Sequence, residues 1–178
     1  MKRLIVLSAL LGAAAVPAVS QTVQAPTMGA MSATEVGIEP MMRLATPLYA
    51  RLALANELRT IEAARYAAGS AGSSATRAMA TDMLCEHLAA LRDLSGIPAA
   101  KLELKLARAS AAHDLAGVRK GAAGGLAEVQ LDWQRHAWAL HSGYAVDGKD
   151  PALRNFARFA VMRAESDLRR LPMRPMKY

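Results

Sequence analysis

The sequence predicts an all-α protein folded as a four-helix bundle. Alanine and leucine dominate the chain and aromatic residues make up only 4% of it, which favours helices packed through small side chains. Apolar residues recur three and four positions apart in four segments, and helix start and stop signals bound these segments. The length of 178 residues suits a single domain.

The first twenty residues have the pattern of a secretory signal peptide. Residues 1–3 are a short positive segment, and residues 4–19 form an apolar run that is too short for the roughly 20 residues of a membrane span. Ala18 and Ser20 are small residues at the positions that a signal peptidase reads, so we expect cleavage after Ser20. A retained anchor is the alternative. No cysteine for lipid attachment directly follows the run, so we expect a periplasmic or secreted protein and not a lipoprotein.

Four parts follow along the chain. We expect a signal peptide over 1–20, a flexible arm over 21–45, a helical bundle domain over 46–171 and a basic tail over 172–178. The only cysteine, Cys85, lies within an apolar helical pattern and is expected to be a buried core residue. The fold is therefore expected to hold without an intrachain disulfide.

Start and stop signals bound the first two helices. A threonine–proline pair at 46–47 begins the first, and glycines within 69–72 end it. Ser73 or Ser74 caps the second, which ends at the Ser-Gly-Ile-Pro segment 95–98. The predicted apolar faces are Leu48, Leu52, Ala55, Leu58, Ile61 and Tyr66 in the first helix, and Ala80, Met83, Leu84, Leu88, Leu91 and Leu94 in the second.

A long crossover is expected between the second and third main helices. Residues 99–123 are helix-prone but weakly patterned, which indicates short helical pieces, and Gly124-Gly125 is expected to break the chain. The third helix covers about 126–142, and Asp150-Pro151 caps a fourth that Pro172 ends. The predicted apolar faces are Leu126, Val129, Trp133, Ala137 and Leu140 in the third helix, and Leu153, Phe156, Ala157, Ala160, Ala164, Leu168 and Leu171 in the fourth.

Residues across 46–171 also lie in the order and spacing of a known family. They are Glu62 with Ala67, Ala78 and Ala80 before Met83, the pair Glu86-His87, His136, and the segment 148–157. Together they resemble the bacterial secreted family of unknown function numbered "forty-one forty-two", often labelled outer membrane proteins. The resemblance implies a ferritin-like four-helix bundle without an established catalytic activity. Ser166-Asp167 replaces the acidic–histidine pair that this family carries near the end of its last helix.

One polar residue on each predicted helix lies on or beside the apolar stripe, namely Glu62, His87, His136 and Asp167. Ferritin-like proteins build metal centres from inward residues of this kind, so these four are the candidate metal ligands. The chain has no Glu-x-x-His pair, and Glu62 falls roughly 10 Å along the bundle from the level of His87. The simpler interpretation is that they are structural polar residues bonded across helices.

Two further patterns resemble metal sites. Met79, Met83 and His87, with Cys85 nearby, offer the soft ligands that copper prefers, although methionine at this spacing usually fills a core. Asp132 and His136 are four residues apart and form either a metal pair or a surface contact. The chain has no Gly-x-Ser-x-Gly motif and no phosphate-binding glycine loop, so the sequence favours a protein that is not an enzyme.

The net charge of +7 is spread along the chain and is not a stripe interleaved with aromatic residues. We therefore expect no nucleic-acid partner, and at most weak contact with anionic membrane surfaces. The leading hypothesis is a non-enzymatic envelope bundle with a structural, stress-related or interaction role, whose partner is an envelope protein or a second copy. No cofactor is predicted. The alternative is a metal-binding or metal-dependent redox protein, in which a transition metal occupies the bundle.

Overall fold

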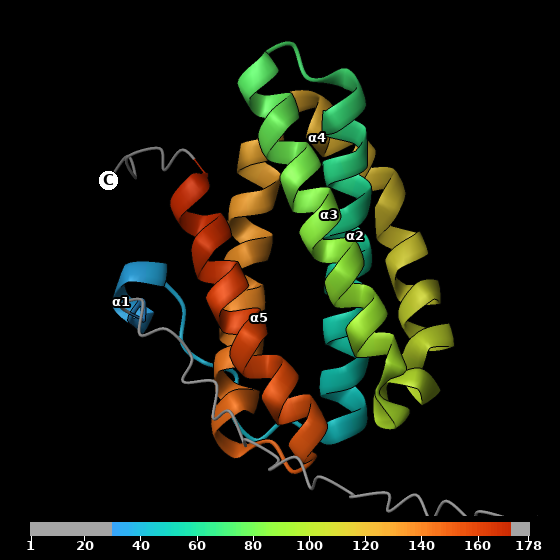
Figure 1. Cartoon of the computed structure of the whole chain (residues 1–178), viewed down its shortest axis with the longest axis vertical. Coiled ribbons are helices and arrows are strands. Elements are labelled where there is room, and N and C mark those ends of the chain that lie inside the picture. Colours follow the sequence, from blue (N-terminus) through green and yellow to red (C-terminus); the bar gives the residue numbers. More distant parts are fainter. Residues whose placement is uncertain (1–29, 172–178) are drawn as a thin grey trace, which may run out of the picture.

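The computed structural model describes residues 30–171, without the side chains of residues 113–116 and 118–129. The elements in this part are the helices α1 (Ala33–Val36), α2 (Thr46–Ser70), α3 (Ser74–Gly96), α4 (Pro98–Asp147) and α5 (Pro151–Arg170) (Figure 1). The prediction of an all-α protein is confirmed for the described part. The predicted signal peptide over 1–20 and the predicted basic tail over 172–178 lie outside the described residues.

The predicted caps position α3 and α5. The Ser73 hydroxyl accepts a hydrogen bond from the backbone N–H of Thr76 at 3.0 Å. The Asp150 carboxylate accepts one from the N–H of Leu153 at 2.9 Å. Each bond satisfies a backbone donor that the first helical turn leaves open. At α2 the prediction is off by one residue, because Thr46 is already helical and no side chain caps this end.

Helix α4 reverses direction along its length. Arg51 on α2 bonds Glu103 near the start of α4 at 2.8 Å. Tyr49, less than one turn away on α2, bonds His141 near the end of α4 at 2.9 Å. A straight helix would hold Glu103 and His141 roughly 57 Å apart. The first part of α4 (yellow) and its last part (orange) accordingly stand on opposite sides of α2 (Figure 1).

The predicted break at Gly124-Gly125, and the short helical pieces before it, are wrong as secondary structure. Helical backbone continues through the whole of Pro98–Asp147. Glycine weakens a helix by about 1 kcal/mol relative to alanine, which is not enough to end one when the flanking residues are good helix formers. Because α4 reverses direction, its first part, which follows α3, and its last part, which leads into α5, nevertheless pack as two separate segments.

The helices alternate in direction around a common interior. The short loops after α2 and α4 make α3 antiparallel to α2, and α5 antiparallel to the last part of α4. Leu153 at the start of α5 shares a core cluster with Tyr49 at the start of α2. Farther along both helices, Arg163 on α5 bonds Glu57 on α2. Therefore α2 and α5 run in one direction, while α3 and the last part of α4 run in the other.

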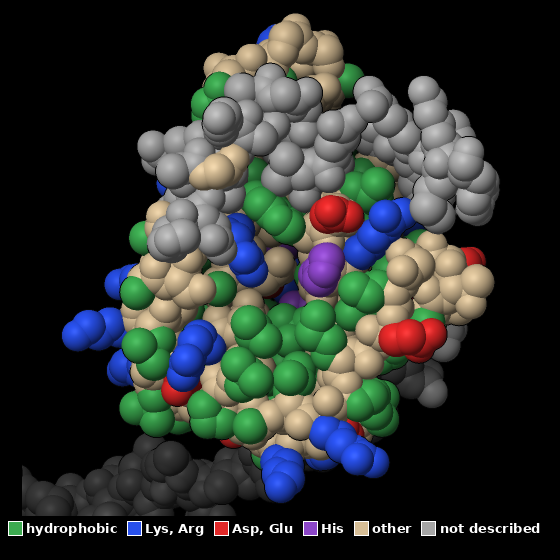
Figure 2. Space-filling view, turned by 180° about the vertical axis from the view of Figure 1, so that it is seen from behind, with side chains coloured by type: hydrophobic (Ala, Val, Ile, Leu, Met, Phe, Trp, Pro, Cys, Tyr) green, Lys and Arg blue, Asp and Glu red, His purple; other side chains and the backbone are tan. Residues whose placement is uncertain are grey.

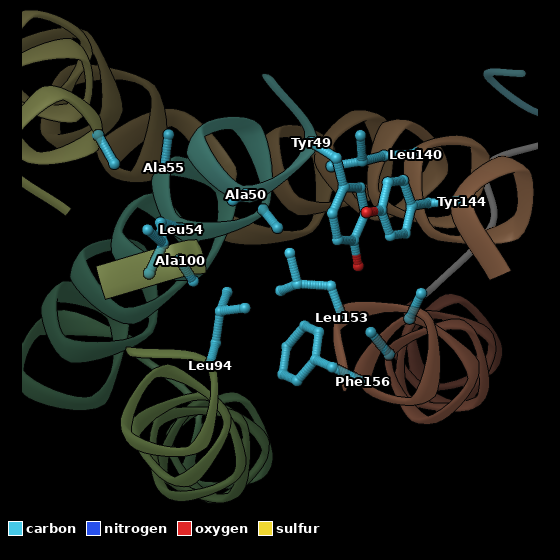
Figure 3. Close-up of a cluster of buried hydrophobic side chains, with 14 of the residues drawn as sticks. Tyr49, Ala50, Leu54, Ala55, Leu94, Ala100, Leu140, Tyr144, Leu153 and Phe156 are labelled. Atoms are coloured by element: carbon cyan, nitrogen blue, oxygen red, sulfur yellow. The ribbon is translucent and has the colours of Figure 1, made fainter. Parts of the chain in front are cut away.

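The largest hydrophobic cluster lies at the end of the bundle where α2 and α5 begin (Figure 3). The rings of Tyr49 and Tyr144 are stacked there, with centroids 3.7 Å apart and planes 8° from parallel. The hydroxyls of Thr46 and Tyr144 are 2.9 Å apart. Alanines from α2, α3, α4 and α5 complete this cluster, which lets the helices approach one another closely.

The apolar face predicted for α5 is confirmed, since all seven of its residues are buried. The face predicted for α2 is wrong in part. Leu48 is 44% exposed and Leu52 is half-buried, whereas Tyr49 and Leu54 are fully buried. Alanine on most sides of α2 leaves little contrast between faces, and α2 packs against α3 and both parts of α4, so it has no single buried stripe. Leu88 on α3 is likewise 43% exposed.

Residues 30–45 pack against the helices, which corrects this part of the flexible arm predicted over 21–45, while its residues 21–29 lie outside the described part of the chain. Val36 in α1 is 1% exposed in a cluster with Trp138 and residues of α5. The backbone N–H of Met41 donates to the carbonyl of Ala139 at 2.8 Å. A Cβ at Gly143 would overlap the Met41 carbonyl, so this close approach requires glycine. The residues that carry these contacts have no helical period, which hid them from pattern analysis.

The single cysteine lies on the surface of α3. Cys85 is a free and exposed cysteine on α3, so its prediction as a buried residue is wrong. The inward residues Met83 and His87 flank it two positions away on either side, and at 100° per residue this turns Cys85 outward.

No helix in the described part of the chain is long and apolar enough to cross a membrane.

Candidate functional site

Four charged side chains meet in the interior, and we call Glu57, His87, Arg163 and Asp167 the central cluster. Nδ1 of His87 lies 2.6 Å from a carboxylate oxygen of Glu57, and Nε2 lies 3.1 Å from a carboxylate oxygen of Asp167. Arg163 donates to the other oxygen of Glu57 at 3.0 Å. His87, Glu57 and Asp167 are at most 2% exposed, and the side chain of Arg163 is 18% exposed.

The helices bring these residues together from three elements. Glu57 and His87 lie equally far before and after the loop at 71–73, so antiparallel packing of α2 and α3 sets them at one level. Asp167 follows Ala164 by three residues on the buried stripe of α5, which turns it inward. Arg163 is one turn before Asp167 on α5 and reaches across to α2.

The cluster is electrically balanced. Burial disfavours a charged imidazole, but the Glu57 carboxylate and the hydrogen bonds that the ring donates to Asp167 and Glu57 outweigh it and raise the pKa of His87 to about 9. Burial also disfavours a charged Glu57, but His87 and Arg163 outweigh it and lower the pKa of that carboxyl. At neutral pH two carboxylates therefore face an imidazolium and a guanidinium, and both ring N–H groups of His87 donate.

A second buried histidine remains neutral. His141 is 1% exposed, and Nδ1 lies 2.9 Å from the Tyr49 hydroxyl. Burial is the main cause that lowers the pKa of His141 to about 3. Burial also raises the pKa of Tyr49, which keeps its hydroxyl protonated and able to donate to Nδ1. The His141 ring also makes edge-to-face contacts with the rings of Tyr49 and Phe156, with centroids 5.8 Å and 5.9 Å away.

Helix α4 adds a polar residue at the same level. Counting along α4 from the His141–Tyr49 and Trp138–Glu165 contacts puts Gln134 about level with Glu57 on α2 and Asp167 on α5. Gln134 is 1% exposed, and neither atom of its amide has a hydrogen-bond partner among the described residues. The second oxygen of Asp167 also has no hydrogen-bond partner there, but it lies 4.0 Å from Nη1 of Arg170, at ion-pair distance.

The structure brings together two of the four predicted metal ligands. His87 and Asp167 touch, but Glu62 bonds Arg65 on its own helix at 3.2 Å. His136 is exposed, and its Nδ1 donates to the backbone carbonyl of Asp132 at 2.8 Å. The single site of Glu62, His87, His136 and Asp167 is therefore not formed. Glu62 lies more than one helical turn from Glu57, the residue of α2 that faces His87. His136 lies half a turn from Gln134, the inward residue of α4 at the level of His87.

Glu57 on α2 and Gln134 on α4 occupy the inward positions that the sequence analysis had assigned to Glu62 and His136. Counting from the loop at 71–73 leads from His87 to Glu57, so the helix level that argues against Glu62 could also have identified Glu57. Gln134 carried no sequence signal, because it lies beside the predicted stripe of its helix.

The other metal patterns are not assembled either. Met83 is buried on the same face of α3 as His87, but both nitrogens of that ring are occupied by carboxylates. Asp132 meets His136 through its backbone carbonyl and not through its carboxylate. In the described part of the chain, no group of three or more His, Cys, Asp or Glu side chains is arranged to hold a metal ion. As it stands, the central cluster offers no free nitrogen ligand.

The chain matches no protein-family model, and searches of curated proteins and of solved structures find no match either.

Proposed function

We propose that this chain is a non-enzymatic bundle protein of the bacterial envelope, with a structural, stress-related or interaction role, that belongs to the secreted family named above. The signal-peptide pattern over 1–20 supports the location, and the motif residues across 46–171 support the family. The helix directions also favour a ferritin-like four-helix bundle of α2, α3, the last part of α4 and α5. The first part of α4 would then be the long crossover.

The pairing within the central cluster carries the non-enzymatic part of the proposal. A general base or nucleophile must have an atom available to the substrate. Both ring nitrogens of His87 instead bond carboxylates, and both oxygens of Glu57 bond cations. Buried charges that pair across three helices can fix the register of those helices, because sliding one helix along another would separate a buried charge from its partner.

Elemental analysis of the purified mature protein tests this proposal. We expect substoichiometric iron, copper, zinc and manganese, with the same values for His87→Gln as for the wild type. A stoichiometric metal that is lost in His87→Gln would contradict a purely structural cluster. Tyr66→Phe, a change in a half-buried residue toward the far end of α2, is the control for altered handling of the protein.

A metal-binding protein is the second candidate, favoured by the unfilled bonding capacity at the cluster. One oxygen of Asp167 and the amide of Gln134 have no hydrogen-bond partner among the described residues. A divalent ion at this place would have to displace the imidazolium proton of His87. Titration of the apo protein with Zn²⁺ in weak buffer should then release protons, and Gln134→Leu should weaken the binding. The absence of proton release would exclude this candidate.

We also propose that the protein acts through its surface, on an envelope protein or on a second copy. Sedimentation of the mature chain over a range of concentrations tests self-association. Weak contact with anionic membranes is a further proposal that rests on the net charge, which is +7 for the full chain and +5 once Lys2 and Arg3 are removed with residues 1–20. It predicts binding to anionic vesicles that weakens as salt is added, and binding that ignores salt would contradict it.

A further inference from the structure

The first part of α4 carries two leucines on its outer side. Leu102 is 82% exposed and Leu106 is 49% exposed, and they lie one helical turn apart on the same face. The opposite side of this segment is covered, because Ala100 and Ala107 are buried in the largest hydrophobic cluster. A single exposed leucine is ordinary at a protein surface, but two leucines stacked on one face form an apolar stripe.

Basic side chains line one edge of this stripe. Lys101, Lys105 and Arg108 are exposed, and the rotation of 100° per residue puts all three on the same side of the two leucines. The ion pairs among the described residues include none of these three side chains. We call Lys101, Leu102, Lys105, Leu106 and Arg108 the leucine–lysine face. Figure 2 shows basic and apolar side chains together along the edge of the molecule where the first part of α4 lies (left).

The acidic residue of this segment is already paired. Glu103 is the one carboxylate among residues 98–112, and Arg51 on α2 donates to it at 2.8 Å. The side chain of Glu103 is 14% exposed, whereas the three basic side chains of the leucine–lysine face are exposed. The positive charges of this face therefore have no counter-charge within residues 98–112. The face is both apolar and positively charged.

The first part of α4 stands where a flat surface can reach it. In Figure 1 this segment (yellow) lies at the outer edge of the bundle, beside α2. Residues 98–112 span roughly 22 Å along the helix, so several turns can touch such a surface at once.

An anionic lipid surface fits the leucine–lysine face better than a second copy of the chain does. A symmetric contact between two copies would set three cations against the same three cations, which costs free energy. At a membrane, leucines enter the boundary between headgroups and acyl chains, while the long stems of lysine and arginine carry their charges to the lipid phosphates. Anionic lipids supply the negative charge that this segment lacks.

We propose that the leucine–lysine face docks the protein on an anionic membrane, with the first part of α4 lying flat on the lipid. The inference rests on the proposed weak contact with anionic membranes and deepens it, because it names the side chains that enter the lipid. Net charge alone would attract the protein in many orientations, whereas this face selects one.

Sedimentation of the mature protein with vesicles tests the proposal. The vesicles contain equal parts of phosphatidylglycerol and phosphatidylcholine, or phosphatidylcholine alone, and we expect binding to the anionic vesicles only. The double variant Leu102→Gln/Leu106→Gln should bind at least about tenfold more weakly, because it removes the inserted apolar groups and keeps every charge. Leu88→Gln/Phe159→Gln makes a comparable change at exposed positions of α3 and α5 and should bind as the wild type does.

Two charge variants separate the leucine–lysine face from the net charge. Arg108→Gln should weaken binding about fivefold, the factor that one basic residue contributes near an anionic membrane. Arg158→Gln removes the same charge from an exposed position on α5 (red), across the bundle from the first part of α4 (Figure 1). It should change binding less than about twofold, because salt screens a charge held away from the lipid. Equal weakening in both variants would show that net charge alone attracts the protein, and would overturn the assigned face.

The results also distinguish the face from the membrane contact itself. Binding that Leu102→Gln/Leu106→Gln leaves unchanged would retain the contact and refute this face. No binding to anionic vesicles at low salt would overturn both, and would favour an acidic protein as the partner. The envelope location and the structural role of the central cluster do not depend on either result. Thermal melting of each variant confirms that it is folded.

Discussion

His87 and Asp167 lie 80 positions apart in the sequence and meet at 3.1 Å in the interior of the bundle. Their contact joins α3 to α5, two helices that are not consecutive in the chain. With Glu57 on the other side of the ring, it makes His87 a cation enclosed by two carboxylates. The stability of the fold therefore depends on the protonation of one buried imidazole.

Stability is expected to fall between pH 6.5 and about 9. The folded pKa of His87 is raised to about 9 from an ordinary value of 6.5, so its contribution is complete below 6.5 and disappears as the pH rises through 9. The pKa of Glu57 is lowered, and its contribution disappears on acidification instead. Urea midpoints measured across this range should show the alkaline decline in the wild type. An equal decline in His87→Gln would contradict this origin.

Glu57→Leu is expected to destabilise the protein by about 3–5 kcal/mol, because it leaves the buried His87 and the half-buried Arg163 without their shared counter-charge. Glu86→Leu is the matched control. Glu86 pairs with Arg170 at the surface, with side chains 39% and 41% exposed, and such pairs contribute at most about 1 kcal/mol. Equilibrium unfolding in urea measures both. Similar losses in the free energy of unfolding for the two variants would show that the central cluster stabilises the fold no more than a surface ion pair does.

Thr60→Val is expected to stabilise the protein by about 1 kcal/mol. Thr60 is fully buried on α2, and its hydroxyl has no hydrogen-bond partner among the described residues, so an apolar residue of the same shape removes a desolvation cost. Thr46→Val makes the same chemical change but removes the contact with the Tyr144 hydroxyl, and should be destabilising. A loss of stability in both variants would indicate a hidden partner for Thr60.

Gly143→Ala is expected to destabilise the protein by about 1–3 kcal/mol, because the new Cβ would overlap the Met41 carbonyl and push the preceding segment off α4. Gly117→Ala provides the control in the same helix. No atom of the described residues lies within 4 Å of a Cβ at Gly117, so alanine there should stabilise by up to about 1 kcal/mol. Melting temperatures that move in the same direction for both variants would contradict the close packing at Gly143.

Cys85 is expected to react stoichiometrically with a thiol reagent in the folded protein, because it is exposed on α3. The measurement is the native labelling rate compared with the rate in denaturant. The fraction of disulfide-linked dimer under oxidising conditions is a second readout, and Cys85→Ser should abolish it. Labelling that occurs only after unfolding would show that Cys85 is buried and would contradict its exposed position.

The α5 segment was predictable from sequence almost in full. Its cap at Asp150 and its seven buried apolar residues were read correctly, because charged residues on the opposite face give this helix a strong contrast. The α2 face was not, since alanine on most sides of that helix makes several faces equally suitable for burial. Packing by both parts of α4 then buried Tyr49 and exposed Leu48.

By itself, the sequence determined the helical class, the caps of α3 and α5, and the inward position of His87 and Asp167, because these depend on spacing within one helix. Only the tertiary structure decided that α4 reverses direction, that residues 30–45 dock on it, and that Glu57 rather than Glu62 meets His87. Those outcomes depend on the level at which separate helices face one another. Local periodicity carries no information on that level until the helices are packed.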